Sequence, residues 1–260
     1  MTSTNEDPPA DSDRRTLPAW LVSQLRPART DFSRRFVCLA KDAKWLDTAL
    51  SGVQIRIMEY LPNARPRLAA QLRFQHGHSP MILGYHPDLE VLLQHGQLSS
   101  AKRVYKASEY FRLPTPNEQA DDQLVIQRAA SMRPDESALL YLAAGQMQQS
   151  DTESRQIDTT DEGFWFAGPV EGTDVLPLHG HGSGNVMLVR WNKTAAFRTR
   201  IDPRGEELLV LDGAVYDAQG HYPAGSWIRN PIEAWQYWGA KAGTIMYYKN
   251  GHFADSDTAA

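Results

Sequence analysis

Three charged residues in the second half of the chain have a spacing that could build a site on one β-strand. Arg200 and Asp202 lie two positions apart, and Glu206 follows four positions later. Because side chains alternate along a strand, residues two positions apart point to the same face. A guanidinium between two carboxylates can bind both of them. The sequence therefore predicts either a structural ion pair, which is the preferred interpretation, or an anchor for a small polar ligand.

The residues that follow Glu206 predict the strands that hold this site. Three short apolar segments alternate with turn signals, and the last segment stops before a proline, which cannot donate to a sheet ladder. This pattern indicates an antiparallel meander. The segments are 208–211, 214–216 and 226–229, and the turns are Asp212-Gly213, 223–225 and Asn230-Pro231.

This stretch resembles the ChrR-like members of the cupin superfamily. In that family an acidic pair opens a strand that ends in glycine, and a Tyr-Pro-Ala-Gly turn leads to Arg-Asn-Pro. The resemblance implies an all-β chain with two tandem cupin barrels of the RmlC-like jelly-roll type, a bicupin that can form a homodimer. It covers roughly residues 45–114 and 138–253, and its motifs are Glu206-Glu207, Gly213, 222–225, 229–231, 145–147, 157–160, 168–172 and 249–252.

The resemblance also implies a metal site, which this sequence alters. In a metal-binding cupin, a His-x-His pair, a glutamate four residues later and a histidine from a distant strand hold the metal. Those positions fall here on Arg200 and Asp202, on Glu206, and near Gln236. Arg200 is a cation and cannot act as a ligand, so we expect no iron, nickel, manganese or zinc in the second half. The four residues are instead predicted to line a ligand pocket.

The first half contains histidines that could contribute to a metal site. A one-residue gap in the comparison of the halves places His86 and Glu90 on ligand positions, and His76 and His78 form an i, i+2 pair. Imidazole and carboxylate groups together suit a divalent transition metal. If a metal binds, these four residues are its predicted ligands, although loop and surface positions are the preferred interpretation of the histidines. Without the gap, the ligand positions fall on Leu83, Tyr85 and Leu89, none of which is a usual metal ligand.

His179 and His181 repeat the i, i+2 spacing in the second half. Gly180, Gly182 and Gly184 surround them and indicate a flexible turn. This pair is therefore a weaker candidate than those above.

The two halves of the sequence repeat each other. At an offset of 117 residues, several Glu, Gly, Arg and Pro residues coincide, and an offset of 120 aligns further residues upstream. The period is longer than that of solenoid arrays, so the repeat indicates two whole domains. The matches include Glu90 with Glu207, Gly96 with Gly213, Arg112 with Arg229, Pro114 with Pro231, Trp45 with Trp165, and Gly52 with Gly172.

These observations predict five segments. The two termini and a stretch in the middle of the chain are polar and nearly free of aromatic residues, as is typical of tails and linkers. Residues 124–132, inside an insertion at about 115–137, have modest helical character. The segments are an N-terminal tail with a short element at 1–32, a first cupin domain at 33–147, a linker at 148–162, a second cupin domain at 163–253, and a C-terminal tail at 254–260.

The composition of the chain limits which kinds of partner and location are expected. The net charge is −4 and the isoelectric point is near 6.1, so no nucleic-acid surface is expected. No apolar run approaches the roughly 18 residues that a membrane helix needs, and the single cysteine, Cys38, cannot form an internal disulfide. The N-terminus lacks a basic region followed by an apolar core, so it does not resemble a secretory signal. A cytoplasmic location is the resulting expectation.

Three functions fit these observations. The preferred one is a non-catalytic bicupin with degenerate metal sites, which binds a small polar or aromatic ligand or acts in regulation or assembly. The first alternative is a metal-dependent cupin enzyme of the dioxygenase type that uses the residues around His86. The second is a ChrR-like anti-sigma regulator, but no Cys and His cluster precedes His76 to form the zinc domain that this resemblance implies.

Overall fold

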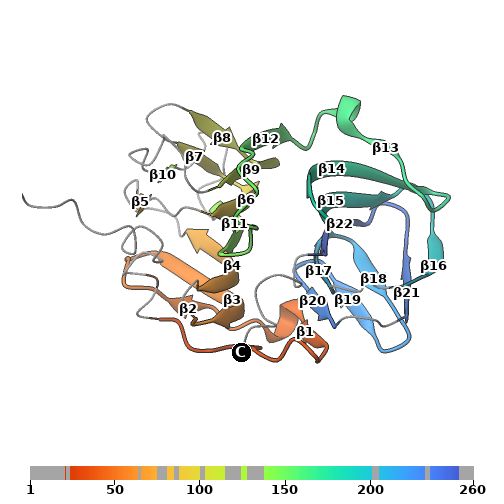
Figure 1. The fold of residues 1–260 in the computed structure, drawn as a ribbon, viewed down its shortest axis with the longest axis horizontal. Coiled ribbons are helices and arrows are strands. Elements are labelled where there is room, and N and C mark those ends of the chain that lie inside the picture. The colour runs from red at the N-terminus through yellow and green to blue at the C-terminus, as the bar shows by residue number, and fades with distance from the viewer. Residues whose placement is uncertain are drawn as a thin grey trace, which may run out of the picture.

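The computed structural model describes residues 21, 24–63, 66–74, 81–84, 88–99, 103–114, 124–127, 138–200, 205–231 and 235–251. Apart from two short 3₁₀ helices, η2 (Ala40–Asp42) and η3 (Glu162–Phe164), the regular elements in these ranges are strands. The all-β prediction is confirmed. Figure 1 shows the strands gathered into two groups that lie side by side and correspond to the two halves of the sequence.

The first half contains one large and one small antiparallel sheet. Its small sheet has the order β5 (Met81–Gly84), β10 (Leu124–Gln127), β7 (Gln97–Ser99) and β8 (Val104–Lys106). The helical character expected at 124–132 is therefore wrong for β10, because pairing with two neighbouring strands outweighs a weak local preference. Its large sheet has the order β12 (Arg155–Asp158), β9 (Glu109–Leu113), β6 (Leu89–His95), β11 (Ala138–Ala144), β4 (Arg67–Phe74), β3 (Val53–Leu61) and β2 (Leu46–Asp47).

The second half repeats this arrangement strand for strand. Each half is a pair of open sheets rather than a closed barrel. The large sheet has the order β1 (Phe36–Cys38), β20 (Trp227–Asn230), β17 (Glu206–Asp212), β22 (Ile245–Asn250), β15 (Gly184–Trp191), β14 (Thr173–His181) and β13 (Phe166–Ala167), and the small one has the order β16 (Ala195–Arg200), β21 (Trp235–Ala240), β18 (Ala214–Tyr216) and β19 (His221–Pro223).

The three strands predicted after Glu206 form near the expected residues, but they do not make one meander. β17 pairs with β20 in the large sheet, whereas β18 pairs with β19 and β21 in the small sheet. The turn at Gly213, whose φ is 69°, carries the chain from one sheet to the other. Local turn signals located the strands, and long-range pairing distributed them between the sheets.

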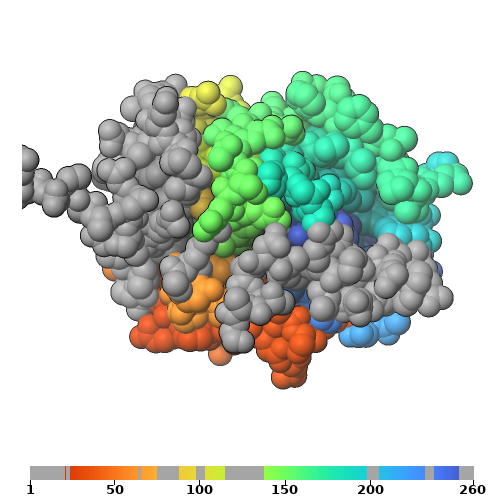
Figure 2. Space-filling model, viewed as in Figure 1, coloured from red at the N-terminus to blue at the C-terminus, as the bar shows by residue number. Residues whose placement is uncertain are grey.

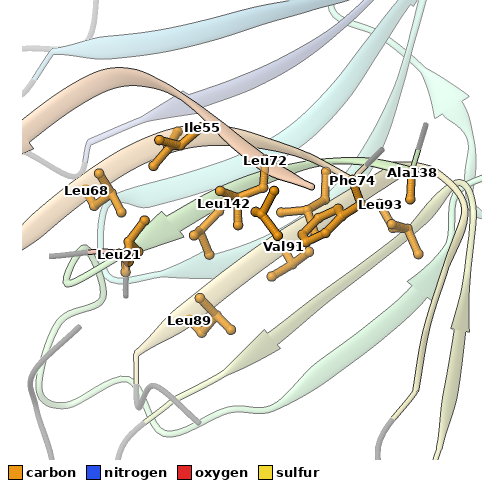
Figure 3. Close-up of a cluster of buried hydrophobic side chains, with 14 of the residues drawn as sticks. Leu21, Ile55, Leu68, Leu72, Phe74, Leu89, Val91, Leu93, Ala138 and Leu142 are labelled. Carbon is orange, nitrogen blue, oxygen red and sulfur yellow. The ribbon is translucent and has the colours of Figure 1, made fainter. Parts of the chain in front are cut away.

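Three apolar clusters hold the molecule together. One fills the first half and includes Ile55 and Val91 (Figure 3), and another fills the second half and includes Leu208. The third cluster draws on both halves and contains Leu92 and Leu209. The two large sheets therefore pack face to face, and Figure 2 shows the two halves in contact across the middle of the molecule.

Each half also donates a strand to the other. β1 lies at the start of the predicted first domain but pairs with β20 of the second half. β12 lies in the predicted linker but pairs with β9 of the first half. A strand near the start of each half thus completes the large sheet of the other half. The predicted boundaries at 33–147 and 148–162 stay predictions, but the elements beside them cross between the halves.

We expect thermal unfolding to occur in a single cooperative transition, because the halves share a core and exchange strands. Differential scanning calorimetry checks this, and the calorimetric and van't Hoff enthalpies should agree. Two resolved transitions would show that the halves unfold independently.

Candidate functional site

Glu206 opens strand β17, and its carboxylate lies inside the second half. Asn230 Nδ2 donates to Oε1 at 2.7 Å, and the Tyr248 hydroxyl donates to Oε2 at 2.7 Å. The side chain is fully buried. Leu208 and Val210, the next residues on this face of the strand, belong to the interior cluster of the second half. Alternation along β17 therefore places the carboxylate among apolar side chains.

This environment makes Glu206 a weak acid. Burial is the largest influence and raises its pKa above the usual glutamate value, while the hydrogen bonds from Tyr248 and Asn230 lower the pKa by less. The carboxyl group therefore keeps its proton to a higher pH than an exposed glutamate does. A protonated carboxyl is a poor metal ligand, because binding a metal requires the ionised form.

The structure describes the other predicted pocket residues only in part. Arg200 ends β16 and is paired with Trp235 of β21, and Gln236 is paired with Thr199. Arg200 and Gln236 are thus not directly paired, and alternation puts them on opposite faces of the small sheet. Their side chains, and all of Asp202, lie outside the described residues. The ion pair between Arg200, Asp202 and Glu206 stays a prediction.

The gapped comparison of the halves placed Glu90 at a metal-ligand position inside the first half, and the structure places it elsewhere. Its side chain is on the face of β6 opposite Leu89 and Val91, which fill the interior of the first half. Lys249 Nζ donates to Glu90 Oε2 at 3.0 Å, and the Tyr247 hydroxyl donates to Oε1. Glu90 therefore sits between the halves. Leu89 takes the interior position, as the ungapped comparison implies, because shifting a strand by one residue exchanges its two faces.

The other histidines proposed for the first half cannot be joined to Glu90. His76, His78 and His86 lie outside the described residues, so their role as ligands stays a prediction. His95 is described and exposed at the end of β6. Among the residues that the structure describes, no group of three or more His, Cys, Asp or Glu side chains could hold a metal ion.

The contacts of Glu90 have a counterpart across the interface. Glu207, its match in the repeat, accepts hydrogen bonds from Trp227 Nε1 at 2.9 Å and from the Tyr141 hydroxyl. Tyr141 belongs to the first half and Tyr247 to the second, so each half supplies a tyrosine to the glutamate of the other. The offset of 117 that pairs Glu90 with Glu207 was the sequence signal for this arrangement.

The charge of Glu90 is balanced by nearby cations. Burial raises its pKa, but Lys249, Arg112 and the hydrogen bond from Tyr247 together outweigh burial, so the pKa lies below the usual value. Glu90 thus stabilises the fold at neutral pH, and this contribution is lost as the pH falls from the usual glutamate value through the lowered pKa.

A second buried cluster joins the halves beside Glu90. Arg112 binds Asp151 through two hydrogen bonds of 2.8 and 2.7 Å, and its Nη1 lies 2.6 Å from His179 Nε2. Burial and the charge of Arg112 lower the pKa of His179, against the opposing effect of Asp151. The ring is therefore neutral near pH 7, and its Nε2 lies within hydrogen-bond distance of Asp151 Oδ2 as well, at 2.9 Å.

Sequence reasoning missed this cluster because its members come from three segments. Asp151 falls in the predicted linker, and His179 falls beside glycines that indicated a flexible turn. In the structure His179 lies within β14, and the turn comprises residues 182–183. Only the packing of one large sheet on the other brings these residues together.

The geometry of this cluster does not match nucleophilic catalysis. Ser150 Oγ lies 2.9 Å from His181 Nε2, but His181 Nδ1 is 4.0 Å from Asp151. That distance is too long for a hydrogen bond, and both Asp151 oxygens already accept from Arg112. The adjoining cavity is about 40 Å³, which is space for water rather than a substrate. The cluster is therefore structural.

Comparison with known families identifies the second half. Residues 153–254 match the family described as the ChrR Cupin-like domain. This part of the chain is similar to a ChrR-like cupin domain. The match spans less than half of the sequence.

Solved structures show that the cupin fold extends over both halves. YlbA from Escherichia coli aligns with a TM-score of 0.60 at 9% identity, over 90% of this chain and 98% of its own. The bacterial pirin YhhW from Escherichia coli, in complex with nickel(II), aligns with a TM-score of 0.53 at 12% identity, over 84% and 99%. Quercetin 2,3-dioxygenase from Acinetobacter baumannii aligns with a TM-score of 0.53 at 11% identity, over 85% and 79%. At these identities the likeness concerns the fold alone.

No curated protein matches this chain by sequence. Within the described residues, no helix is long and apolar enough to cross a membrane.

We expect Lys249→Met to lower the free energy of unfolding by about 3–5 kcal/mol, because it leaves Glu90 buried without its cation. Adding Glu90→Gln should restore most of the loss. Chemical denaturation at pH 7 measures both effects. Lys193→Met is the matched control, since Lys193 pairs with Glu171 on the surface and its loss should cost less than about 0.5 kcal/mol. Equal effects of the two lysine variants would contradict the assignment.

Proposed function

We propose that this tandem cupin is a binding protein with degenerate metal sites rather than a metal-dependent enzyme. The observation that carries the proposal is the state of Glu206. The resemblance makes this residue the carboxylate ligand of the second half, yet it is fully buried and bound by Asn230 and Tyr248, and its pKa is raised. The raised pKa disfavours the ionised form, which is the form that binding a metal requires.

The residues at the remaining ligand positions support the same reading. Arg200 is permanently charged, and a cation beside a divalent metal would be repelled. Gln236 offers only an amide in place of the imidazole that the resemblance implies. The donor set of the second half therefore does not fit iron, nickel, manganese or zinc.

The ligand of this site would be small and polar or aromatic. Gln236 is paired with Thr199 and Arg200 with Trp235, so alternation puts Gln236 and Arg200 on opposite faces of the small sheet. Glu206 begins a strand of the large sheet of the same half. The amide of Gln236 and the buried carboxyl of Glu206 suit a ligand with both donors and acceptors. We place this binding role in the cytoplasm, with a homodimer as the possible assembly.

Metal content tests the proposal. We expect protein purified without a metal-affinity tag to contain far less than one equivalent of iron, nickel, manganese or zinc by elemental analysis. The melting temperature should not change after treatment with a chelator. One equivalent of a metal that the chelator removes, with a fall in melting temperature, would overturn the proposal.

We expect Glu206→Gln to become stabilising, relative to the natural protein, as the pH rises. A raised pKa means that the contribution of Glu206 to stability is complete below the usual glutamate value and is lost as the pH rises through the folded-state pKa. Glutamine mimics the protonated acid and removes this dependence. Melting temperatures from pH 4.5 to 8.5 measure the difference.

Glu171→Gln is the control for this series, because the Glu171 side chain is 92% exposed. Its melting temperature should differ from that of the natural protein by the same amount across this pH range. A constant difference for Glu206→Gln as well would show that Glu206 is ionised in the folded protein and would remove the main support for the proposal.

The alternative of a metal-dependent enzyme draws on the fold. The structural neighbours include a nickel complex and a dioxygenase, and His76, His78 and His86 could supply ligands in the first half. Glu90 would then have to leave Lys249. If a metal is found, the His86→Ala substitution should abolish metal binding. Unchanged metal content in this variant would contradict this alternative. The anti-sigma alternative rests on the family resemblance alone.

A further inference from the structure

We infer that a cavity between the two halves is a binding site for a neutral, mainly apolar small molecule of aromatic type. The cavity has a volume of about 400 Å³, which lies within the range of small-molecule pockets. It lies at the junction of the halves, where pockets commonly form. Its apolar lining includes Leu92, Trp165, Leu188, Leu211 and Ile245, and the polar Gln94 and His95 also line it. Glu206 is not part of this lining, so the site goes beyond the function proposed above.

Because the two halves repeat each other, the first half contains a position equivalent to this cavity. Polar side chains fill that position. Arg56 of β3 donates to the carbonyl oxygens of Gly225, Cys38 and Leu39 at 2.5, 3.0 and 3.2 Å. It also donates to Gln71 Oε1 at 3.1 Å, and Gln71 donates to Gln94 Oε1 at 2.9 Å. The guanidinium and the two amides form a buried polar plug.

In the second half, three leucines replace this plug. Arg56 and Gln71 are paired between β3 and β4, and Leu176 and Leu188 are paired between β14 and β15. Leu211 stands at the irregularity of β17 that corresponds to Gln94 in β6. The counterparts of Arg56, Gln71 and Gln94 are therefore Leu176, Leu188 and Leu211.

The exchange replaces the hydrogen-bonded polar side chains by leucines, which give the cavity an apolar wall. Leu176 is fully buried in the core between the halves and Leu188 nearly so, so neither side chain reaches across to the carbonyl groups as Arg56 does. On the other side, the Thr159 hydroxyl donates to the Ser108 carbonyl oxygen, where Arg56 reaches Gly225 in the first half. The polar atoms are satisfied without a plug, and the leucine surface gains by covering with an apolar ligand.

The charges at the cavity indicate that its ligand is neutral. Arg190 stacks on Trp165, with its guanidinium carbon 4.3 Å from the ring centre. It donates to both Glu162 oxygens at 2.7 and 2.8 Å and to Asp174 at 3.0 Å. Arg190 and Glu162 thus balance each other at the rim, so a charged ligand would lie on leucine without a counter-ion.

Binding of a neutral fluorescent probe, N-phenyl-1-naphthylamine, tests the inference. We expect one saturable site on the intact chain, with the anionic probe anilinonaphthalene sulfonate at least tenfold weaker. Leu211→Trp should weaken N-phenyl-1-naphthylamine at least tenfold, because Leu211 is half-buried on the cavity wall. Binding without saturation, equal affinity for the two probes, or unchanged affinity of the Leu211→Trp variant would overturn the inference.

Two sets of variants use the repeat as an internal control. Leu176→Arg with Leu188→Gln and Leu211→Gln copies the polar plug into the second half and should abolish probe binding. The reverse set, Arg56→Leu with Gln71→Leu, leaves the lining of the cavity unchanged, because neither residue belongs to it. This set should open the counterpart and raise the stoichiometry to two probes per chain. Circular dichroism and melting temperature identify sets that fail to fold, and Leu211→Trp then decides the outcome alone.

The Glu206→Gln variant tests whether the probe binds in this cavity or at the site of the proposed function. This substitution lies inside the second half and should leave the affinity for N-phenyl-1-naphthylamine unchanged. Tenfold weaker binding by Glu206→Gln would place the probe in the second half instead and overturn the inference, whereas the metal content of the protein bears only on the proposed function.

Discussion

The reciprocal hydrogen bonds between tyrosine and glutamate hold the two large sheets in register, and the rest of the structure depends on them. Tyr247 of the second half binds Glu90 of the first, and Tyr141 of the first half binds Glu207 of the second. The two rings lie 5.0 Å apart, centre to centre. A glutamate buried between sheets is tolerated only when its oxygens are bound. The requirement for these partners therefore specifies how one half sits on the other.

Around this shared centre, the two halves differ at equivalent positions. One half has a long polar side chain where the other has a short side chain or none. Arg229 binds Glu59 and the carbonyl oxygen of Asp31, while its counterpart Arg112 binds His179 and the side chain of Asp151. A further arginine, Arg67, also binds Glu59 at 2.5 Å. The matching position in the second half is Gly184, which has no side chain and lines the small cavity near Arg112.

The larger cavity has the same origin. A long polar side chain, Arg56, bridges the halves on one side, and the short apolar Leu176 stands in its place on the other. Divergence of this kind leaves the order of the strands unchanged, since both halves have the same strand order. It alters only which groups are available to a ligand, which agrees with the rule that function belongs to sites rather than to folds.

The sequence by itself determined the all-β class, the repeat and the cupin resemblance, because alternation, turn residues and family motifs are local signals. It also placed Glu206 at the start of a strand that faces the interior. Tertiary structure decided the rest. The one-residue choice between Leu89 and Glu90 follows from which face of β6 meets the other half. The exchange of β1 and β12, and the meeting of Arg112 with Asp151 and His179, depend on contacts between segments far apart in the chain. Such contacts leave no periodic trace in the sequence, so only the packing of one sheet on the other reveals them.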